Sequence, residues 1–219
     1  MRDILDRVER WLAEGKKVAL ATVIATERAA PRGPGAVLAV TEDLEVAGSV
    51  TGGCVEAAVI EEATDVIQTG RPKRLTYGIT DDDARAVGLS RGGTVHLFIE
   101  RVQGELVTAL GQAIHGAVPV ALVTEVTGPR PGAKMLLLPR RILGSLEDCR
   151  FEDEVVTDAQ VMLERGETGL HRYGLSGEIG GDDMEVFIES FAPPARMDVF
   201  GATTYATSVP WLGKDWAIG

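Results

Sequence analysis

The stretch from Gly48 to Gly70, GSVTGGCVEAAVIEEATDVIQTG, has a counterpart at 144–166, GSLEDCRFEDEVVTDAQVMLERG, and this pair is the strongest indication of the fold. Each begins with Gly-Ser and ends at a glycine, and the apolar residues between recur at helical spacing and predict a helix. The same offset of 96 residues relates Gly78 to Gly174. Matches that keep one offset indicate an internal repeat.

The flanking segments repeat in the same order. The pairs are VALATVI at 18–24 with VALVTEV at 120–126, PGAVLAV at 34–40 with PGAKMLL at 131–137, RLTYGI at 74–79 with GLHRYGL at 169–175, and VHLFIE at 95–100 with MEVFIE at 184–189. These runs read as strands around helices. The sequence therefore predicts an α/β fold of two tandem duplicated units, with mixed sheets and flanking helices. We expect units at 1–103 and 104–195, followed by a stub at 196–219.

Composition excludes several functional classes. The net charge of −11 argues against nucleic-acid and anionic-membrane partners, which bind mainly to basic surfaces. No apolar run is long enough for a membrane helix, and the acidic N-terminal segment does not resemble a signal sequence. Two cysteines make no disulfide framework, so we expect a cytoplasmic protein with reduced thiols. His96, His115 and His171 are scattered without ligand spacing, so no metal site is expected.

The two copies differ in the loop that precedes the repeated helix. The first copy has GSVTGGCVE, whereas the second replaces its glycine pair with acidic residues. Glycines let a backbone approach a ligand, and a helix N-terminus attracts anions and favours a thiolate at Cys54. We therefore expect the first copy to carry the site and the second to be structural. Two other readings stay open here, a cysteine that merely fills the core and a glycine pair that merely makes a tight turn.

Two further loops of the first copy could converge on Cys54. APRGPG supplies Arg32, and GLSRGGT supplies Arg91 with Gly92 and Gly93. An arginine is a natural partner for phosphate or carboxylate, although each of these could equally be a solvated surface charge. The acidic run 81–83 favours helix capping over a cation site.

These motifs together resemble a known family. PRGPGAVLAVTEDLEVAGSVTGGCVEAAVIEEA, AVGLSRGGTVHLFIE and the later VFIESFAPPARMDVFGA are similar to the XdhC/CoxI family, the accessory proteins of xanthine dehydrogenase and carbon monoxide dehydrogenase. The resemblance runs from about Val18 to Ala202, and its GSVTGGCVE core is specific.

The resemblance implies a role in molybdoenzyme maturation. Members bind molybdenum cofactor (molybdopterin) transiently, assist its sulfuration by a cysteine desulfurase, and deliver it to a molybdenum hydroxylase apo-enzyme. It implies Cys54 as the reactive thiol, which makes the chain more a cofactor-binding chaperone than a catalyst. The implied cofactor-binding residues are Arg32, Gly35, Ser49, Gly52, Gly53, Cys54, Arg91, Gly92 and Gly93. A thiol-dependent sulfur transferase or reductase, and a degenerate scaffold for maturation partners, are the alternatives.

The chain departs from the family pattern in two places. Many relatives carry a cysteine where this sequence has Arg91, which bears on any activity that needs two thiols. RMDVFGATTYA resembles the first strand and glycine turn of a Rossmann-like domain, but the sequence stops at Gly219. We expect 196–219 to be a truncated stub that frays, docks on the body, or is exchanged within a homodimer.

Overall fold

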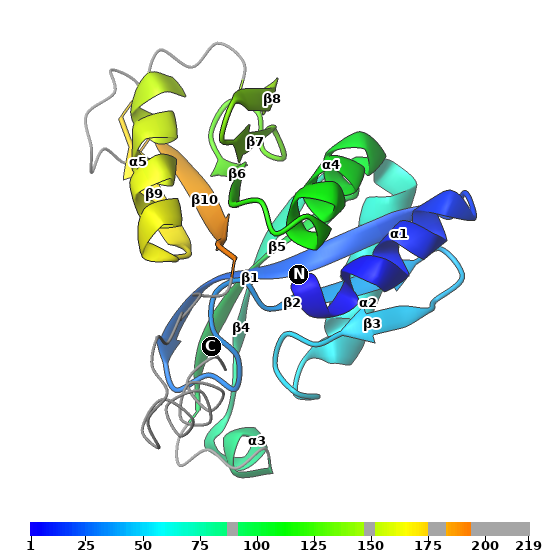
Figure 1. Cartoon of the computed structure of the whole chain (residues 1–219). Helices are drawn as coiled ribbons and strands as arrows, with labels where there is room; N and C mark the ends of the chain where they lie inside the picture. Colours follow the sequence, from blue (N-terminus) through cyan, green and yellow to red (C-terminus); the bar gives the residue numbers. More distant parts are fainter. Residues whose placement is uncertain (87–91, 147–151, 175–182, 194–219) are drawn as a thin grey trace, which may run out of the picture.

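The computed structural model describes residues 1–86, 92–146, 152–174 and 183–193 (Figure 1). The elements up to β5 form what we call the first unit, and those from α4 onward form the second unit. The first unit comprises η1 (Arg2–Ile4), α1 (Leu5–Ala13), β1 (Val18–Arg28), β2 (Val37–Thr41), β3 (Val46–Gly48), α2 (Glu56–Thr69), β4 (Lys73–Gly78), α3 (Asp81–Ala86) and β5 (Gly93–Arg101). The second unit comprises α4 (Gly104–His115), β6 (Val120–Thr127), β7 (Lys134–Leu138), β8 (Arg141–Ser145), α5 (Glu152–Arg165), β9 (Gly169–Tyr173) and β10 (Met184–Phe191).

The two units have the same sheet topology, which confirms the predicted tandem α/β fold. Their strand orders are β3-β2-β1-β5-β4 and β8-β7-β6-β10-β9. The prediction of mixed sheets was wrong in one respect, because every described strand pair is antiparallel. In the first unit α2 joins two strands that run the same way, as in a βαβ crossover. Those strands lie at opposite edges of the sheet, so they are never neighbours.

One helix of each unit packs its apolar face on its own sheet. The buried residues of this face repeat at the predicted offset and are Val59, Ala63 and Val66 on α2, and Val155, Ala159 and Met162 on α5. Both helices stop at a glycine in the left-handed region, with φ of 69° at Gly70 and 67° at Gly166. The repeat detected in the sequence is therefore a repeat of packing.

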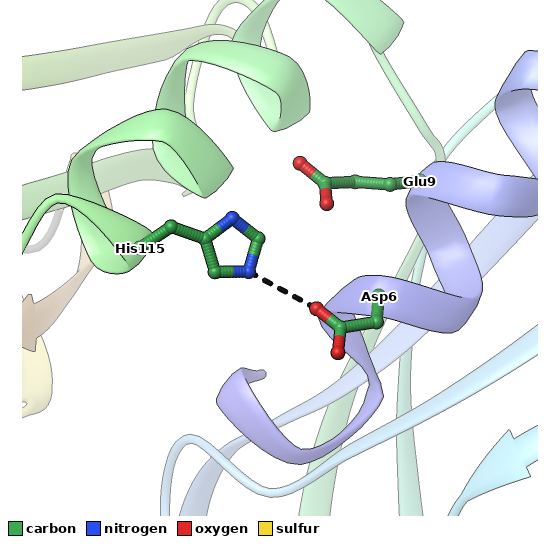
Figure 2. Close-up of side chains that lie close together, drawn as sticks. All are labelled: Asp6, Glu9 and His115. Carbon is green, nitrogen blue, oxygen red and sulfur yellow. Dashed lines mark hydrogen bonds and ion pairs between the residues drawn. The ribbon is translucent and has the colours of Figure 1, made fainter.

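Helices α1 and α4 lie against each other between the units (Figure 1). Figure 2 shows their polar contact, in which His115 Nε2 lies 3.0 Å from Asp6 Oδ1. The Glu9 carboxylate occupies the space that a side chain at Gly111 would take, because a Cβ there would collide with it. Asp6, Glu9 and His115 bring their polar atoms within 4.8 Å of one another. Such a partly exposed group is common without an ion, and we assign no metal to it.

The two sheets also meet directly, through apolar and charged contacts. Ile24 and Phe98 of the first unit pack on Val126 and Phe187 of the second. Arg74 on β4 contacts the carboxylate of Glu185 on β10, and Lys134 on β7 lies 2.7 Å from Glu100 on β5. These contacts hold the units together. The division into separate domains at 103 and 195 stays a prediction, and 196–219 lie outside the described residues.

Candidate functional site

The Gly-Gly-Cys loop connects β3 to α2 at one end of the first sheet. Gly52 and Gly53 have φ of 76° and 121°, a region in which other residues are strained. Helix α2 begins at Glu56 with Val55 as its N-cap, so Cys54 stands one residue before the cap. The predicted position of the thiol, close to a helix N-terminus, agrees with this geometry.

The carboxylate of Glu56 organises this loop, a role that the sequence prediction missed. Its two oxygens accept hydrogen bonds from the backbone N–H groups of Val50, Thr51, Gly53 and Val55 at 2.8 to 3.2 Å. The hydroxyls of Ser49 and Thr51 also donate to it, at 2.6 and 2.7 Å, and the Gly52 N–H donates to Ser49 Oγ at 2.8 Å. Of the residues predicted to cradle an anionic ligand, Gly53 and Ser49 therefore already donate to this internal anion, and the Gly52 amide donates to Ser49.

This hydrogen bonding shifts the acidity of Glu56. Partial burial by itself raises the pKa of the carboxyl, but the hydrogen bonds from Ser49 and Thr51 outweigh it and lower the pKa to about 2. The carboxylate is thus a fixed negative charge at neutral pH. It stabilises the loop conformation and weakens the case for a second anion bound to the same amides.

Part of this arrangement is repeated in the second unit, where Ser145 Oγ donates to Glu152 Oε2 at 3.0 Å. Ser145 and Glu152 stand 96 residues after Ser49 and Glu56. A Ser–Glu bond present in both units indicates a structural connection between strand and helix. The Ser-x6-Glu spacing was the sequence signal that could have revealed it. The glycine pair and Cys54 remain specific to the first unit.

Cys54 is half-buried and packs on a small apolar cluster around Ile79 and Val95. Ala30, from the loop that also holds Arg32, packs on the same cluster. The structure thus gathers part of the 28–36 loop, Cys54 and the end of β4 at one place. Cys54 is neither sealed in the main core nor fully exposed.

The other predicted residues are distributed more widely. Gly92 packs against the backbone of Ile79, and Gly93 against that of Ala29, so close backbone approach explains both glycines without a ligand. Gly35, with φ of 88°, faces Thr168 of the second unit instead of the Cys54 loop. Arg32 is exposed, and Arg91 lies outside the described residues.

Asp81, in the acidic run expected to cap a helix, makes a longer-range contact. Its Oδ1 accepts a hydrogen bond from the Gly92 N–H at 2.8 Å, which ties the start of α3 to the turn before β5.

No helix of the described residues is both long and apolar enough to cross a membrane.

Together these features characterise a type of protein with two tandem α/β units, in which the first carries a Gly-Gly-Cys loop ahead of its central helix. The chain belongs to the XdhC and CoxI family, whose model matches residues 11–78 and 113–174, more than half of its length.

The chain is also similar to one curated protein in sequence and to one solved structure in fold. Molybdenum cofactor insertion chaperone PaoD of Escherichia coli (strain K12) is 39% identical over 77 residues, which cover 35% of this chain and 24% of the relative. A crystal structure described as that of a xanthine dehydrogenase from Bacillus halodurans matches with a TM-score of 0.62 at 19% identity, over 94% of this chain and 59% of that one. The latter likeness concerns the fold alone. The chain matches less than two thirds of the length of either protein.

Proposed function

We propose that this protein is a molybdoenzyme maturation factor that binds molybdenum cofactor as cargo in its first unit. It would assist sulfuration of the cofactor by a cysteine desulfurase and its insertion into a xanthine dehydrogenase or carbon monoxide dehydrogenase type apo-enzyme, in the cytoplasm. Family membership and the similarity to an insertion chaperone support this role. The observation that carries it is the Gly-Gly-Cys loop, which Glu56 holds in one conformation with a half-buried thiol beside it.

Cys54, Glu56 and Arg32 have different roles in this proposal. Cys54 offers the thiolate, as a ligand to the cargo metal or as the carrier of a sulfur atom received from the persulfide of a desulfurase. Glu56 keeps the loop rigid, which lowers the entropy cost of presenting the thiol. Because the Glu56 carboxylate already accepts hydrogen bonds from amides of this loop, the phosphate of the cargo would be held by other donors. The exposed Arg32, two residues from Ala30 of the cluster that contains Cys54, is the donor that we propose.

Cys54→Ala tests the proposal. Loss of one metal–thiolate contact should weaken retention of molybdenum cofactor by roughly 100-fold, about 3 kcal/mol, or abolish sulfur loading, while the melting temperature changes little. Cofactor titration and thermal melts on the wild type and the variant measure both effects. Cys149→Ala, in the second copy of the motif and outside the described residues, is the matched control and should leave retention unchanged.

The two alternatives give different results. If Cys54→Ala lowers only the melting temperature, the cysteine is a core residue and the thiol role is refuted. If the wild type itself retains no cofactor, the chain is better described as a scaffold for maturation partners. The occupation of the loop amides by Glu56 is the observation that favours the scaffold.

A further inference from the structure

The second unit contains a cavity of about 670 Å³ between the start of α4, the β6–β7 loop and strand β8. Its walls include Gln103 and Leu106 from the start of α4, Arg130 and Lys134 around the β6–β7 loop, and Gly144 and Ser145 from β8. This volume lies in the range of small-molecule sites. The cavity is far along the chain from the Cys54 loop and uses none of its residues.

The equivalent place in the first unit is filled. There Ile4 packs over Gly48, with its Cγ2 only 3.1 Å from where a Cβ of Gly48 would stand, and Ile4 and Val37 are both buried. In the second unit, the nearest atoms around Gly144 belong to the backbone of β7, and Leu106 lines the open space. The cavity therefore exists because α4 does not close on β8 as η1 closes on β3. The two units therefore share one sheet topology but differ in packing at this place.

The chemistry of the walls also differs between the units. The PGAV of the first unit becomes PGAK in the second, so that Lys134 replaces the buried Val37. Lys134 is mostly buried and is held by Glu100 at 2.7 Å and by Thr124 Oγ1 at 2.6 Å. Arg130 adds an exposed guanidinium at the rim. Lys134, paired with Glu100, and the exposed Arg130 line this space, whereas the first unit has the buried Val37 at the position of Lys134.

A helix N-terminus opens into the same cavity. Helix α4 is 12 residues long, and its N-cap Gln103 makes no side-chain cap hydrogen bond within the described structure. The Gln103 amide instead donates to the carbonyl of Gly132 at 3.3 Å, which links two walls of the cavity. The first-turn N–H groups of a helix and its dipole favour an anion. The cavity, the two cations and the helix end point to the same kind of ligand.

We propose that this cavity binds a small molecule that carries a phosphate monoester. The phosphate lies between the N-terminus of α4 and Arg130, and the body of the ligand lies against Leu106 and Leu143. Glu105, in the first turn of α4, opposes the anion and limits its affinity. This site is independent of the proposed cofactor site in the first unit. It assigns to the second unit a ligand, where the sequence suggested a purely structural copy.

The test is a titration of the full chain, labelled with ¹⁵N, with inorganic phosphate, adenosine monophosphate and adenosine. The two phosphate compounds should shift the amide signals of Glu105, Leu106 and Gly132, and adenosine should not. Arg130→Ala should weaken binding by about ten-fold, because it removes a charge-assisted hydrogen bond. Glu105→Gln should strengthen it several-fold. Arg140→Ala, at the turn between β7 and β8 and away from the cavity walls, makes the same charge change and should have no effect.

Three results would overturn the proposal. Equal binding of adenosine and adenosine monophosphate would show that the phosphate is not recognised. Equal losses in Arg130→Ala and Arg140→Ala would indicate non-specific charge attraction. Shifts confined to the loop around Cys54, or no shifts at millimolar phosphate, would remove the site from the second unit. Displacement of adenosine monophosphate by molybdenum cofactor would instead support the proposal, and it would identify the phosphate of the pterin as the group that the cavity binds.

Discussion

Glu56 shows how one side chain can change the interpretation of a loop. The sequence GSVTGGCVE suggests a backbone cradle for a ligand, but its amides donate to a carboxylate of the same loop. Thr51, which is fully buried, contributes both its N–H and its hydroxyl. The glycines of this loop serve the internal anion first. A ligand would have to use the thiol and the outer face of the loop.

Glu56→Gln should destabilise the protein at neutral pH by about 2 kcal/mol, because an uncharged amide accepts these hydrogen bonds more weakly. The folded pKa of about 2 lies below the ordinary value of 4.5, so the stabilisation is present above pH 4.5 and is lost as the pH falls toward 2. Chemical unfolding of the variant and the wild type at several pH values measures this difference.

The exposed Glu61 on the same helix provides the control for this prediction. Glu61→Gln removes the same charge from an exposed position that does not organise the Gly-Gly-Cys loop. It should therefore alter the free energy of unfolding by less than about 0.5 kcal/mol. A deficit of Glu56→Gln that stayed the same from pH 7 to pH 2.5 would show that the carboxylate charge does not stabilise the loop.

The elements are repeated together with the glycines that end them. Gly48 and Gly144 have φ of 83° and 79° where the edge strands end, and a Cβ at either would collide with a carbonyl oxygen of the neighbouring strand. Gly70 and Gly166 have a similar φ at the helix ends but have open space around them. Glycine is therefore favoured at all four positions because the backbone is left-handed there. At Gly48 and Gly144 it is also needed because the neighbouring strand leaves no room for a side chain.

Alanine substitution should separate these two cases. Gly70→Ala should cost about 1 kcal/mol, the strain of a left-handed residue. Gly48→Ala should cost more than about 2 kcal/mol, because the strand β2 must also move. Thermal or chemical unfolding of both variants measures the difference, and Gly166→Ala with Gly144→Ala repeats the comparison in the second unit. If the strand-end and helix-end substitutions of one unit cost the same, the close contact between the strand-end glycines and the neighbouring strand would be contradicted.

Across the molecule as a whole, buried carboxylates lie where the two units meet. Glu100 on β5 and Glu189 on β10 occupy equivalent positions in VHLFIE and MEVFIE, and both are buried. Burial raises the pKa of Glu189 to about 7, against the opposing positive charges of the Met1 α-amino group and Lys134. Glu185 on the same strand differs, since hydrogen bonds from Arg74 and Arg172 outweigh its burial and lower its pKa.

Glu189→Gln should therefore make the protein more stable at pH 8 and leave it unchanged near pH 4.5. The folded pKa of Glu189 is raised, so its contribution to stability is complete below pH 4.5 and is lost as the pH rises through about 7. The uncharged amide avoids this loss. Melting temperatures of the variant and wild type between pH 4.5 and pH 8 measure it, and we expect a gain of at least about 3 °C at pH 8.

Glu185→Gln is the control with the opposite sign. Its folded pKa is lowered, so the substitution should destabilise the protein at pH 7, and that loss should shrink as the pH falls below the ordinary value of 4.5. If Glu189→Gln lowered the melting temperature at pH 8, as Glu185→Gln is expected to do, burial would not be the cause of the raised pKa of Glu189.

The local features of this protein follow from its sequence alone. The helical period of Val59, Ala63 and Val66, the strands on either side and the glycine at each helix end arise from the preferences of neighbouring residues, and the 96-residue offset copies them. The thiol before the helix was likewise readable from a short segment.

The features that join distant segments depend instead on the three-dimensional packing. Antiparallel sheet order, the backbone contact that requires Gly92, and the position of Gly35 against Thr168 depend on which strands become neighbours. The role of Glu56 as acceptor of the loop hydrogen bonds was present in the sequence only as the repeated Ser-x6-Glu spacing, and the fold shows that its carboxylate turns back onto the loop instead of into solvent. The cavity beside Lys134 depends on how far a helix stands from a strand, and that distance is set by the packing of the whole chain.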